Sequence, residues 1–248
     1  MKISIVLPSY NEQENIKKGV LHSVYAFLEQ QEWSYELILS DDGSTDGTIK
    51  ALRDFAKGKN HITLIENPHR GKGPTVRAGM LAATGDYRLF TDFDQATPLS
   101  EIEKLLPFMK KGFHIAIGSR EVYGSRREKE PIYRHIMGKG FNILVQMIAI
   151  PGIWDTQCGF KLFSAEATIE LFPRLRVYAG NSELKAAFTG AFDVELLYLA
   201  KKHGMKIAEV PVSWKHVKTN RVDPVKDSVQ MFIDIVRIRA ADLAGKYR

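Results

Sequence analysis

The sequence predicts an α/β fold in which helices cover both faces of a mostly parallel sheet. Short apolar runs typical of buried strands alternate along the chain with segments whose apolar residues recur at helical spacing. Four of these runs are followed directly by the polar clusters "PSYNE", "SDDGSTD", "TDFD" and "GSR". Parallel sheets bind ligands beyond the carboxyl ends of their strands, so these clusters are expected to form a site. A chain of 248 residues is long enough for one such domain.

The expected elements begin with a buried strand at residues 3–7. Asn11 and Glu14 then have the spacing of a capping box, which predicts the start of a helix whose apolar stripe includes Val20 and Val24. Further strands are expected at residues 36–40, 62–66, 87–91 and 114–117, and further helices around residues 49–55, after Pro74 and at residues 102–109. The regular alternation of strand and helix indicates parallel pairing.

Composition limits the class of protein. The apolar and charged fractions, 44% and 26%, are those of an ordinary globular protein, and the net charge of +6 suits anionic partners such as nucleotides, phosphates or an acidic membrane surface. The single cysteine, Cys158, excludes an intramolecular disulfide. The longest uncharged stretch, residues 140–154, is shorter than the ~20 apolar residues of a spanning helix, so we expect no transmembrane segment.

The loop "SDDGSTDGT" at residues 40–48 concentrates three acids and two glycines. Asp, Gly and Ser are common turn formers, so Asp41, Asp42 and Asp46 are consistent with a turn. Their place after a buried strand is also consistent with a ligand site. The residues alone leave both interpretations open.

The segment "TDFDQATP" places Asp92 and Asp94 two residues apart, directly after an apolar run. In an extended chain these side chains point the same way, and two carboxylates aimed together repel unless a cation lies between them. Oxygen-only ligands suit Mg²⁺ or Mn²⁺ bridging substrate phosphates. The alternative is a turn with a capping aspartate. We favour the metal site because a phosphate-compatible loop is expected nearby.

That loop, "HRGKGPTVRAG", surrounds Gly71 and Gly73 with Arg70, Lys72 and Arg77 just before a helix. Exposed backbone amides, the positive end of the helix and these cations favour binding of a diphosphate, although a solvated basic loop is the alternative. The spacing of a Walker A loop is missing, and the first strand–helix turn, "PSYNEQEN", has no glycine. ATPases and nicotinamide dehydrogenases are therefore disfavoured.

The order of the motifs resembles that of the family 2 inverting glycosyltransferases with the GT-A fold. The motifs are "VLPSYNE", "DDGSTDGT", "GKG", "DFD", "GSR", "DTQCGFKLF", "FDVELLYLA" and "EVPVSWKH". Within that family, "DxDxAT" and "DTQCGFKLF" are most similar to the dolichyl-phosphate β-glucosyltransferases, followed by the polyprenyl-phosphate mannose synthases. The resemblance implies a GT-A domain, which we place at residues 1–218. Residues 219–248 are expected to form a C-terminal amphipathic helical extension, where many relatives carry transmembrane helices.

This resemblance assigns residues to the sugar donor. The nucleotide-binding residues that it implies are Pro8, Tyr10, Glu12, Asp41, Asp42, Lys72, Asp92 and Arg221. It also implies that Asp92 and Asp94 hold Mg²⁺ or Mn²⁺ against the donor diphosphate, with Asp94 counted among the catalytic residues. One departure concerns a third metal ligand, because mannose synthases commonly carry a glutamine where this chain has Ala96. Water would then fill that position.

Arg120 and Arg134 match the arginines that bind the acceptor phosphate in this family. The second pKa of a lipid monophosphate is ~6, so transfer to it at neutral pH needs cations rather than a strong general base. Asp155, also counted as catalytic, heads a segment that faces the sugar in relatives. It would orient the acceptor, act as a base or cap a helix. Cys158 is expected to pack, and Trp214 to border the site.

The leading hypothesis is a metal-dependent inverting transferase that moves a hexose from a nucleotide sugar to a polyprenyl or dolichyl phosphate. UDP-glucose is the favoured donor and GDP-mannose the next. One alternative is transfer to a saccharide or protein hydroxyl, for which Asp155 or Asp193 would be the general base. Another is a non-catalytic subunit that binds nucleotide sugar. No nucleic-acid partner is expected.

A lipid acceptor requires access to a membrane. Residues 137–154 have an apolar middle, and the expected C-terminal helix carries Val229, Phe232, Val236 and Leu243 roughly on one face. Both patterns are typical of interfacial helices and equally of helices that pack on a core. We therefore expect a cytoplasmic protein, either free or bound peripherally to a membrane surface or a membrane-protein partner.

Overall fold

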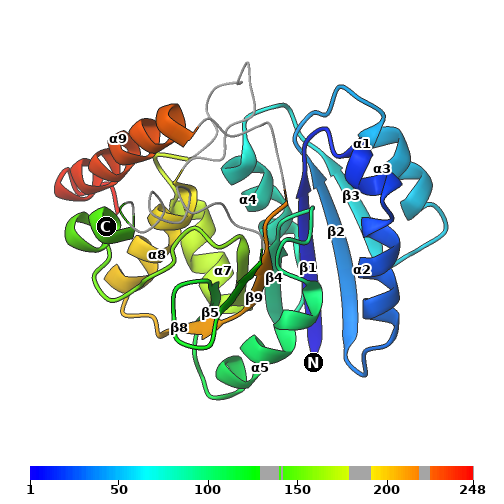
Figure 1. Ribbon diagram of the computed structural model, residues 1–248, viewed down its shortest axis with the longest axis horizontal. Helices are drawn as coiled ribbons and strands as arrows, with labels where there is room; N and C mark the ends of the chain where they lie inside the picture. The colour runs from blue at the N-terminus through cyan, green and yellow to red at the C-terminus, as the bar shows by residue number, and fades with distance from the viewer. Residues whose placement is uncertain (129–139, 141, 179–190, 218–223, 248) are drawn as a thin grey trace.

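A seven-stranded sheet forms the centre of the protein, in the order β3-β2-β1-β4-β7-β5-β8. The structure is a computed structural model that describes residues 1–128, 140, 142–178, 191–217 and 224–247, without the side chains of residues 224–228 (Figure 1). The strands are β1 (Lys2–Ser9), β2 (Ser34–Asp41), β3 (Ile62–Glu66), β4 (Tyr87–Thr91), β5 (Ile115–Ser119), β7 (Phe160–Ser164) and β8 (Ile207–Pro211). Neighbouring strands are parallel except that β7 runs antiparallel to both β4 and β5. The predicted mostly parallel sheet is confirmed.

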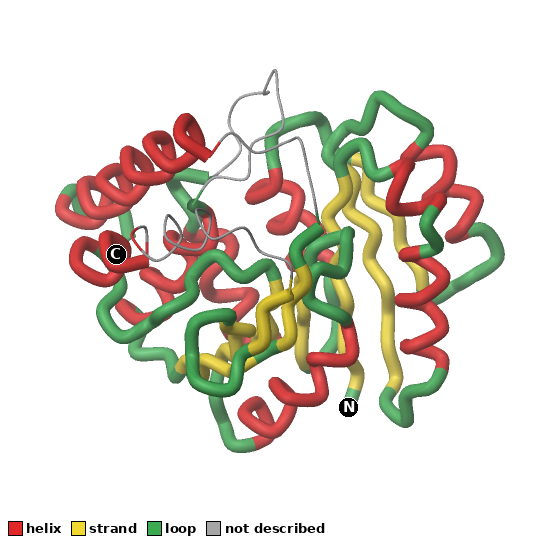
Figure 2. The backbone as a smooth tube through the Cα atoms, viewed as in Figure 1, coloured by secondary structure: helices red, strands yellow, loops and turns green. Residues whose placement is uncertain are grey.

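Helices cover both faces of this sheet (Figures 1 and 2). They are α1 (Gln13–Lys17), α2 (Val20–Glu29), α3 (Thr48–Ala56), α4 (Lys72–Ala82), α5 (Ile102–Lys110), α7 (Ala165–Leu171), α8 (Phe192–Lys202) and α9 (Pro224–Leu243), with a further helical segment at 142–148. Two short strands, β6 (Arg126–Glu128) and β9 (Ser213–Lys215), pair in a separate small sheet.

Two apolar layers fill the space between sheet and helices. One layer contains buried residues of α2, α3 and α5, and the other contains those of α4, α7, α8 and α9. Successive side chains of a strand point to opposite faces, and β1 follows this rule: Ile5 and Leu7 belong to the first layer and Val6 to the second. The α/β fold class predicted from the sequence is thereby confirmed.

Three local features differ from the expectation. Asn11 does not cap a helix, because its side-chain oxygen accepts hydrogen bonds from the backbone N–H groups of Thr45 (2.8 Å) and Asp46 (3.3 Å) in the acidic loop. The single helix expected after it is broken into α1 and α2 at Gly19, whose φ of 84° is left-handed. Strands β7 and β8 have no counterpart among the expected strands, since a charged residue, Lys161 in β7 and Glu209 in β8, interrupts the apolar pattern of each.

The C-terminal helix α9 joins the layer that contains α8. Its Ile235, Ile238 and Ala241 are buried there together with Tyr247. The Tyr247 hydroxyl donates a hydrogen bond to Glu195 of α8 (2.6 Å). The domain boundary expected near residue 218 falls outside the described residues and stays a prediction.

Candidate active site

Four polar loops meet at one edge of the sheet. Strands β1, β2, β4 and β5 run in the same direction and end at Ser9, Asp41, Thr91 and Ser119. The polar clusters of the sequence begin at the last one or two residues of these strands and continue into the loops. Their predicted convergence at the carboxyl edge is confirmed.

The two acids at the end of β2 hold the surrounding loops in place. The buried Asp41 carboxylate accepts hydrogen bonds from the hydroxyl of Ser9 (2.8 Å) and from the backbone N–H and hydroxyl of Ser44 (both 2.7 Å). The buried Asp42 carboxylate accepts one from the backbone N–H of Gly71 (3.0 Å). Both acids therefore shape the loops, as the turn interpretation expects. Their contact with a nucleotide stays a prediction.

An aromatic stack lies beside these loops. The rings of Tyr10 and His69 are nearly parallel, with centroids 4.2 Å apart and an interplanar angle of 5°. Nδ1 of His69 lies 2.8 Å from the Asp42 carboxylate, so this acid also orients the ring. Glu12 is buried, and its backbone N–H donates to the hydroxyl of Thr48 (2.8 Å) at the start of α3. The residues expected to bind the nucleoside thus lie on adjoining loops, with Pro8 just before the end of β1.

The acids of the "DFD" motif stand in a turn at the end of β4. This strand ends at Thr91, so the extended conformation expected for Asp92 and Asp94 is wrong. Gln95 closes the turn with a φ of 53°, a left-handed value that is uncommon outside glycine, and its N–H donates to the Asp92 carbonyl (3.2 Å). Phe93 is buried in the core, whereas the Asp92 side chain is 35% exposed. The turn is therefore anchored by Phe93 and leaves the Asp92 carboxylate accessible.

Lys72, at the start of α4, contacts the first of these acids, Asp92. Its Nζ lies 2.5 Å from Oδ1 of Asp92. Burial alone would lower the pKa of Lys72, but the carboxylates of Asp92, Asp193 and Asp94 outweigh burial and raise this pKa. Burial and the neighbouring Asp92 charge raise the pKa of Asp94 to about 6. The acids therefore create a negative potential that a divalent cation would neutralise.

The Asp92–Asp94 pair fits Mg²⁺ or Mn²⁺. Both donors are carboxylates, and within the described residues no group of three or more His, Cys, Asp and Glu side chains is placed to hold a metal. Mg²⁺ commonly binds one or two carboxylates and completes its shell with water and substrate phosphates. Gly159 leaves room for Asp92, because a Cβ there would lie 2.1 Å from Oδ2 of Asp92. The sequence analysis missed Gly159, since nothing in "DTQCGF" shows which residue it packs on.

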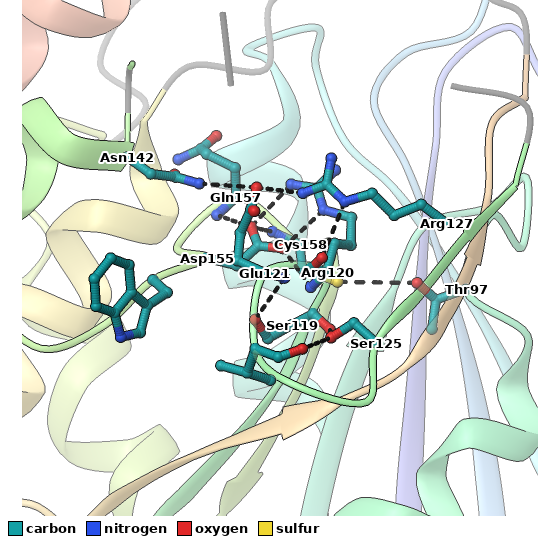
Figure 3. Close-up of polar contacts among 12 residues, drawn as sticks. Thr97, Ser119, Arg120, Glu121, Ser125, Arg127, Asn142, Asp155, Gln157 and Cys158 are labelled. Atoms are coloured by element: carbon teal, nitrogen blue, oxygen red, sulfur yellow. Dashed lines mark hydrogen bonds and ion pairs between the residues drawn. The ribbon is translucent and has the colours of Figure 1, made fainter. Parts of the chain in front are cut away.

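Arg120 follows β5 and is held against a buried acid (Figure 3). Its Nε and Nη2 donate to Oδ2 and Oδ1 of Asp155 at 2.8 and 2.9 Å, and its backbone N–H donates to Oδ2 at 2.8 Å. The guanidinium carbon lies 5.4 Å from the centroid of the Trp214 ring, so Trp214 borders the site as expected. Two-pronged pairing with a carboxylate fixes the plane of the guanidinium.

Asp155 acts on Arg120 and has no contact with solvent. Its side chain is 0% exposed, and its Oδ1 also accepts a hydrogen bond from the backbone N–H of Cys158 (3.1 Å). Burial would raise the pKa of Asp155, but the Arg120 charge and hydrogen bonds lower it to about 2. Such a carboxylate is poorly matched to the work of a general base at neutral pH. Its expected catalytic role stays a prediction, and the geometry allows that role only through Arg120.

Arg127 is a cation beside Arg120 that the sequence analysis missed (Figure 3). It lies on β6, and its Nε donates to the carbonyl oxygen of Arg120 (3.0 Å). Its guanidinium pairs with Glu121. In the sequence, Arg127 is part of the charged run "SRREKE", which gives no sign that the chain folds back on Arg120.

A buried ion pair lies behind the site. Lys161 of β7 and Asp193 in the first turn of α8 are 0% and 1% exposed, and Nζ of Lys161 lies 2.7 Å from Oδ1 of Asp193. Burial raises the pKa of Asp193, although Lys161 and Lys72 oppose the rise. Burial also raises the pKa of the nearby Cys158 thiol to about 11, which fits the packing role expected for it.

Two expected site residues, Arg134 and Arg221, lie outside the described residues, and their roles stay predictions. The expectation about membrane spans can be compared with the helices. Within the described part of the chain, every helix is too short or too polar to cross a membrane.

Comparison with known families identifies the chain. Residues 4–172 match the family model described as Glycosyl transferase family 2. The chain belongs to glycosyl transferase family 2. Its fold is the GT-A fold, and because this family inverts configuration, the chain is an inverting glycosyltransferase.

Relatives of this family 2 enzyme align with almost its whole length. It is 36% identical over 260 residues to a dolichyl-phosphate beta-glucosyltransferase of Dictyostelium discoideum, covering 99% of this chain and 76% of the relative. It is 35% identical over 272 residues to the Homo sapiens protein of the same name, covering 100% of this chain and 78% of the relative.

Solved structures of other glycosyltransferases share the fold at low identity. Mannosyl-3-phosphoglycerate synthase from Rubrobacter xylanophilus matches with a TM-score of 0.67 at 18% identity, covering 99% of this chain and 76% of that one. Glucosyl-3-phosphoglycerate synthase from Mycobacterium tuberculosis, in complex with Mn²⁺, UDP-glucose and phosphoglyceric acid, matches with a TM-score of 0.65 at 17% identity, covering 99% and 79%. These matches support the GT-A fold.

Proposed function

We propose that this family 2 glycosyltransferase transfers glucose, with inversion, from UDP-glucose to a dolichyl or other polyprenyl phosphate. The Dictyostelium and human relatives named above, both dolichyl-phosphate beta-glucosyltransferases, support this donor sugar and acceptor. The acceptor class rests on one structural observation. Asp155 and Asp193, the general bases that a hydroxyl acceptor would need, are both buried and paired with Arg120 and Lys161.

A phosphate acceptor makes such a base unnecessary. Its second pKa is ~6, so at neutral pH a lipid monophosphate already carries a nucleophilic oxygen with no proton to remove. That oxygen attacks the anomeric carbon of glucose, the bond to the departing UDP breaks, and the configuration inverts in this single step. Arg120, oriented by Asp155, binds the acceptor phosphate, and Arg134 is the second cation assigned to it.

The donor is assigned to the loops after β1, β2 and β4. Lys72 is assigned to the diphosphate oxygens, and its contact with Asp92 supports this assignment. Asp92 and Asp94 hold Mg²⁺ or Mn²⁺, and the Mn²⁺ bound by the mycobacterial synthase supports this choice. The bound cation supplies positive charge that stabilises the leaving diphosphate. The residues assigned to the nucleotide are Pro8, Tyr10, Glu12, Asp41, Asp42 and Arg221.

The test of this function compares two donors and two acceptors. Purified protein is incubated with labelled UDP-glucose or GDP-mannose and with either a short-chain polyprenyl phosphate or the matching polyprenol. We expect label in the lipid fraction only when UDP-glucose is incubated with the polyprenyl phosphate. Transfer to the polyprenol, or label confined to a saccharide or protein fraction, would contradict the acceptor assignment. Mannose transfer in place of glucose transfer would contradict the donor assignment.

We further propose that α9 contacts the membrane that holds the acceptor, at its cytoplasmic face. Ile235 and Ile238 face the core, yet the opposite side of α9 is also apolar and is 40% to 82% exposed. This exposed stripe consists of Val229, Phe232, Ile233, Val236 and Leu243. The neighbouring Arg237 side chain is 61% exposed and supplies a cation for anionic lipids.

Sedimentation with vesicles tests the membrane contact. We expect the protein to bind vesicles that contain anionic lipid and Val236→Asp to weaken this binding. Ile169→Asp is the matched control, because Ile169 is also an exposed β-branched residue (61%, compared with 47% for Val236) and lies on α7, outside the stripe. Equal vesicle binding by the two variants would show that α9 is not the membrane contact.

A further inference from the structure

One segment contacts both Arg120 and Asp92, which lie on different loops of the active site. Residues 155–159 begin with Asp155, which holds Arg120, and end with Gly159, whose carbonyl accepts a hydrogen bond from the Asp92 N–H (3.1 Å). Gly159 also packs directly on the Asp92 carboxylate, since an added Cβ would meet Oδ2 at 2.1 Å. The position of Arg120 relative to Asp92 therefore depends on this segment.

The Lys161–Asp193 pair anchors the segment. Nζ of Lys161 donates to the carbonyl oxygen of Cys158 (2.5 Å) as well as to Asp193 (2.7 Å). The N–H of the same Cys158 donates to Asp155 (3.1 Å). Because Asp193 belongs to α8, a helix buried in the core, the pair fastens residues 155–159 to a rigid element.

Stability alone does not account for this pair. Removing two opposite charges from water is costly, and an apolar pair of similar volume is often equally or more stable. In some proteins, buried ionic groups instead specify one arrangement of their neighbours. The neighbour in question is Cys158, which connects the pair to Asp155 on one side and to Gly159 on the other.

We propose that Lys161 and Asp193 are positioning residues for glucosyl transfer. By holding residues 155–159, they set the separation between the metal-binding Asp92 and the acceptor-binding Arg120. The roles of Asp92 and Arg120 in this inference rest on the proposed function. Lys161 and Asp193 are fully buried and act through the backbone of Cys158 and Gly159.

A double variant separates positioning from stability. Lys161→Met/Asp193→Leu removes both charges and leaves neither uncompensated, so its melting temperature should stay close to that of the wild type. The kcat for glucose transfer should still fall roughly 10- to 100-fold, because changes behind a metal site have effects of this size. KM for UDP-glucose should change much less. Lys2→Met/Glu36→Leu is the matched control, since it removes a lysine–carboxylate pair (2.9 Å) at the opposite, amino-terminal edge of the sheet and should leave kcat unchanged.

A measurement of Mn²⁺ binding tests this inference without requiring glucose transfer. Titration with Mn²⁺ in the presence of UDP reports on Asp92, and the double variant should bind Mn²⁺ roughly 10-fold more weakly than the wild type. Lys161→Gln/Asp193→Asn also leaves no uncompensated charge and keeps polar side chains at both positions. If the first double variant does not fold, this second one is titrated, and the same weakening is expected. Wild-type affinity for Mn²⁺ in whichever variant folds would overturn the inference. Absence of transfer by the wild type would overturn only the proposed function.

Discussion

Replacing Gly159 with alanine tests how closely the "DTQCGF" loop packs on Asp92 of the proposed metal-binding pair. The backbone φ of Gly159 is not positive, so alanine can adopt the same backbone conformation. Any effect of the substitution therefore comes from the added Cβ. That Cβ would lie 2.1 Å from Oδ2 and 2.5 Å from Oδ1 of Asp92, below the 3.0 Å that real Cβ contacts keep. The carboxylate must therefore retreat by about 1 Å, and a displacement of that size costs on the order of 100-fold in rate. This factor corresponds to about 2.7 kcal/mol of transition-state stabilisation.

The assay measures kcat with UDP-glucose and a short-chain polyprenyl phosphate, alongside Mn²⁺ affinity and thermal unfolding. We expect kcat and Mn²⁺ affinity to fall together while the melting temperature changes little, because the displaced group is the end of a partly exposed side chain. Gly140→Ala is the control, since a Cβ at Gly140 meets none of the described residues within 4 Å. Wild-type kcat in Gly159→Ala would refute the reasoning, because the transfer would then not depend on where Asp92 lies.

Three further changes have defined outcomes. Asp94→Ala should abolish transfer and leave the fold intact, and EDTA should imitate it until Mn²⁺ or Mg²⁺ is restored; full activity in chelated buffer would refute the metal assignment. Arg120→Lys keeps the charge but loses the planar fork, so kcat/KM for the lipid phosphate should fall while UDP affinity, measured by calorimetry, stays the same. The pKa of Asp155 is lowered to about 2 from an ordinary 3.8, so its contribution to stability is complete above about pH 4 and is lost as pH falls toward 2. Urea unfolding should show a loss of about 2 kcal/mol over that range, which Asp155→Asn should lack.

Most of the sheet could be predicted from local patterns, but two of its strands, β7 and β8, were missed. Strands β3 and β4 coincide with the predicted residues 62–66 and 87–91, because apolar runs between polar loops indicate strands without any knowledge of the fold. Strand β7 has a lysine in its middle. Lys161 can be buried there only because Asp193, more than thirty residues later in the chain, supplies its counter-charge. No local pattern records such a partner.

Members of the site could be predicted better than their roles. The order of motifs singled out Asp41, Asp42 and Asp155, but what each carboxylate holds comes from a distant loop. Asp155 left three roles open in the sequence, and only its two-pronged contact with Arg120 shows which group it acts on. Arg127 was missed for the same reason, since its contact with Arg120 requires β6 to fold back along the loop after β5.

Pairing of charges links these observations. Within the described residues, Lys72 lies on Asp92, Arg120 on Asp155, and Arg127 on Glu121. These pairs hold the lysine and arginine side chains in place before any substrate binds. Electrostatic catalysis requires such preorganised charges. The pairs differ in what they can release. Asp155 is fully buried and keeps Arg120, whereas Asp92 is partly exposed and, under the proposed function, would exchange Lys72 for a divalent cation. Lys72 would then be available to the donor diphosphate, so the same carboxylate would bring both positive charges to the leaving group.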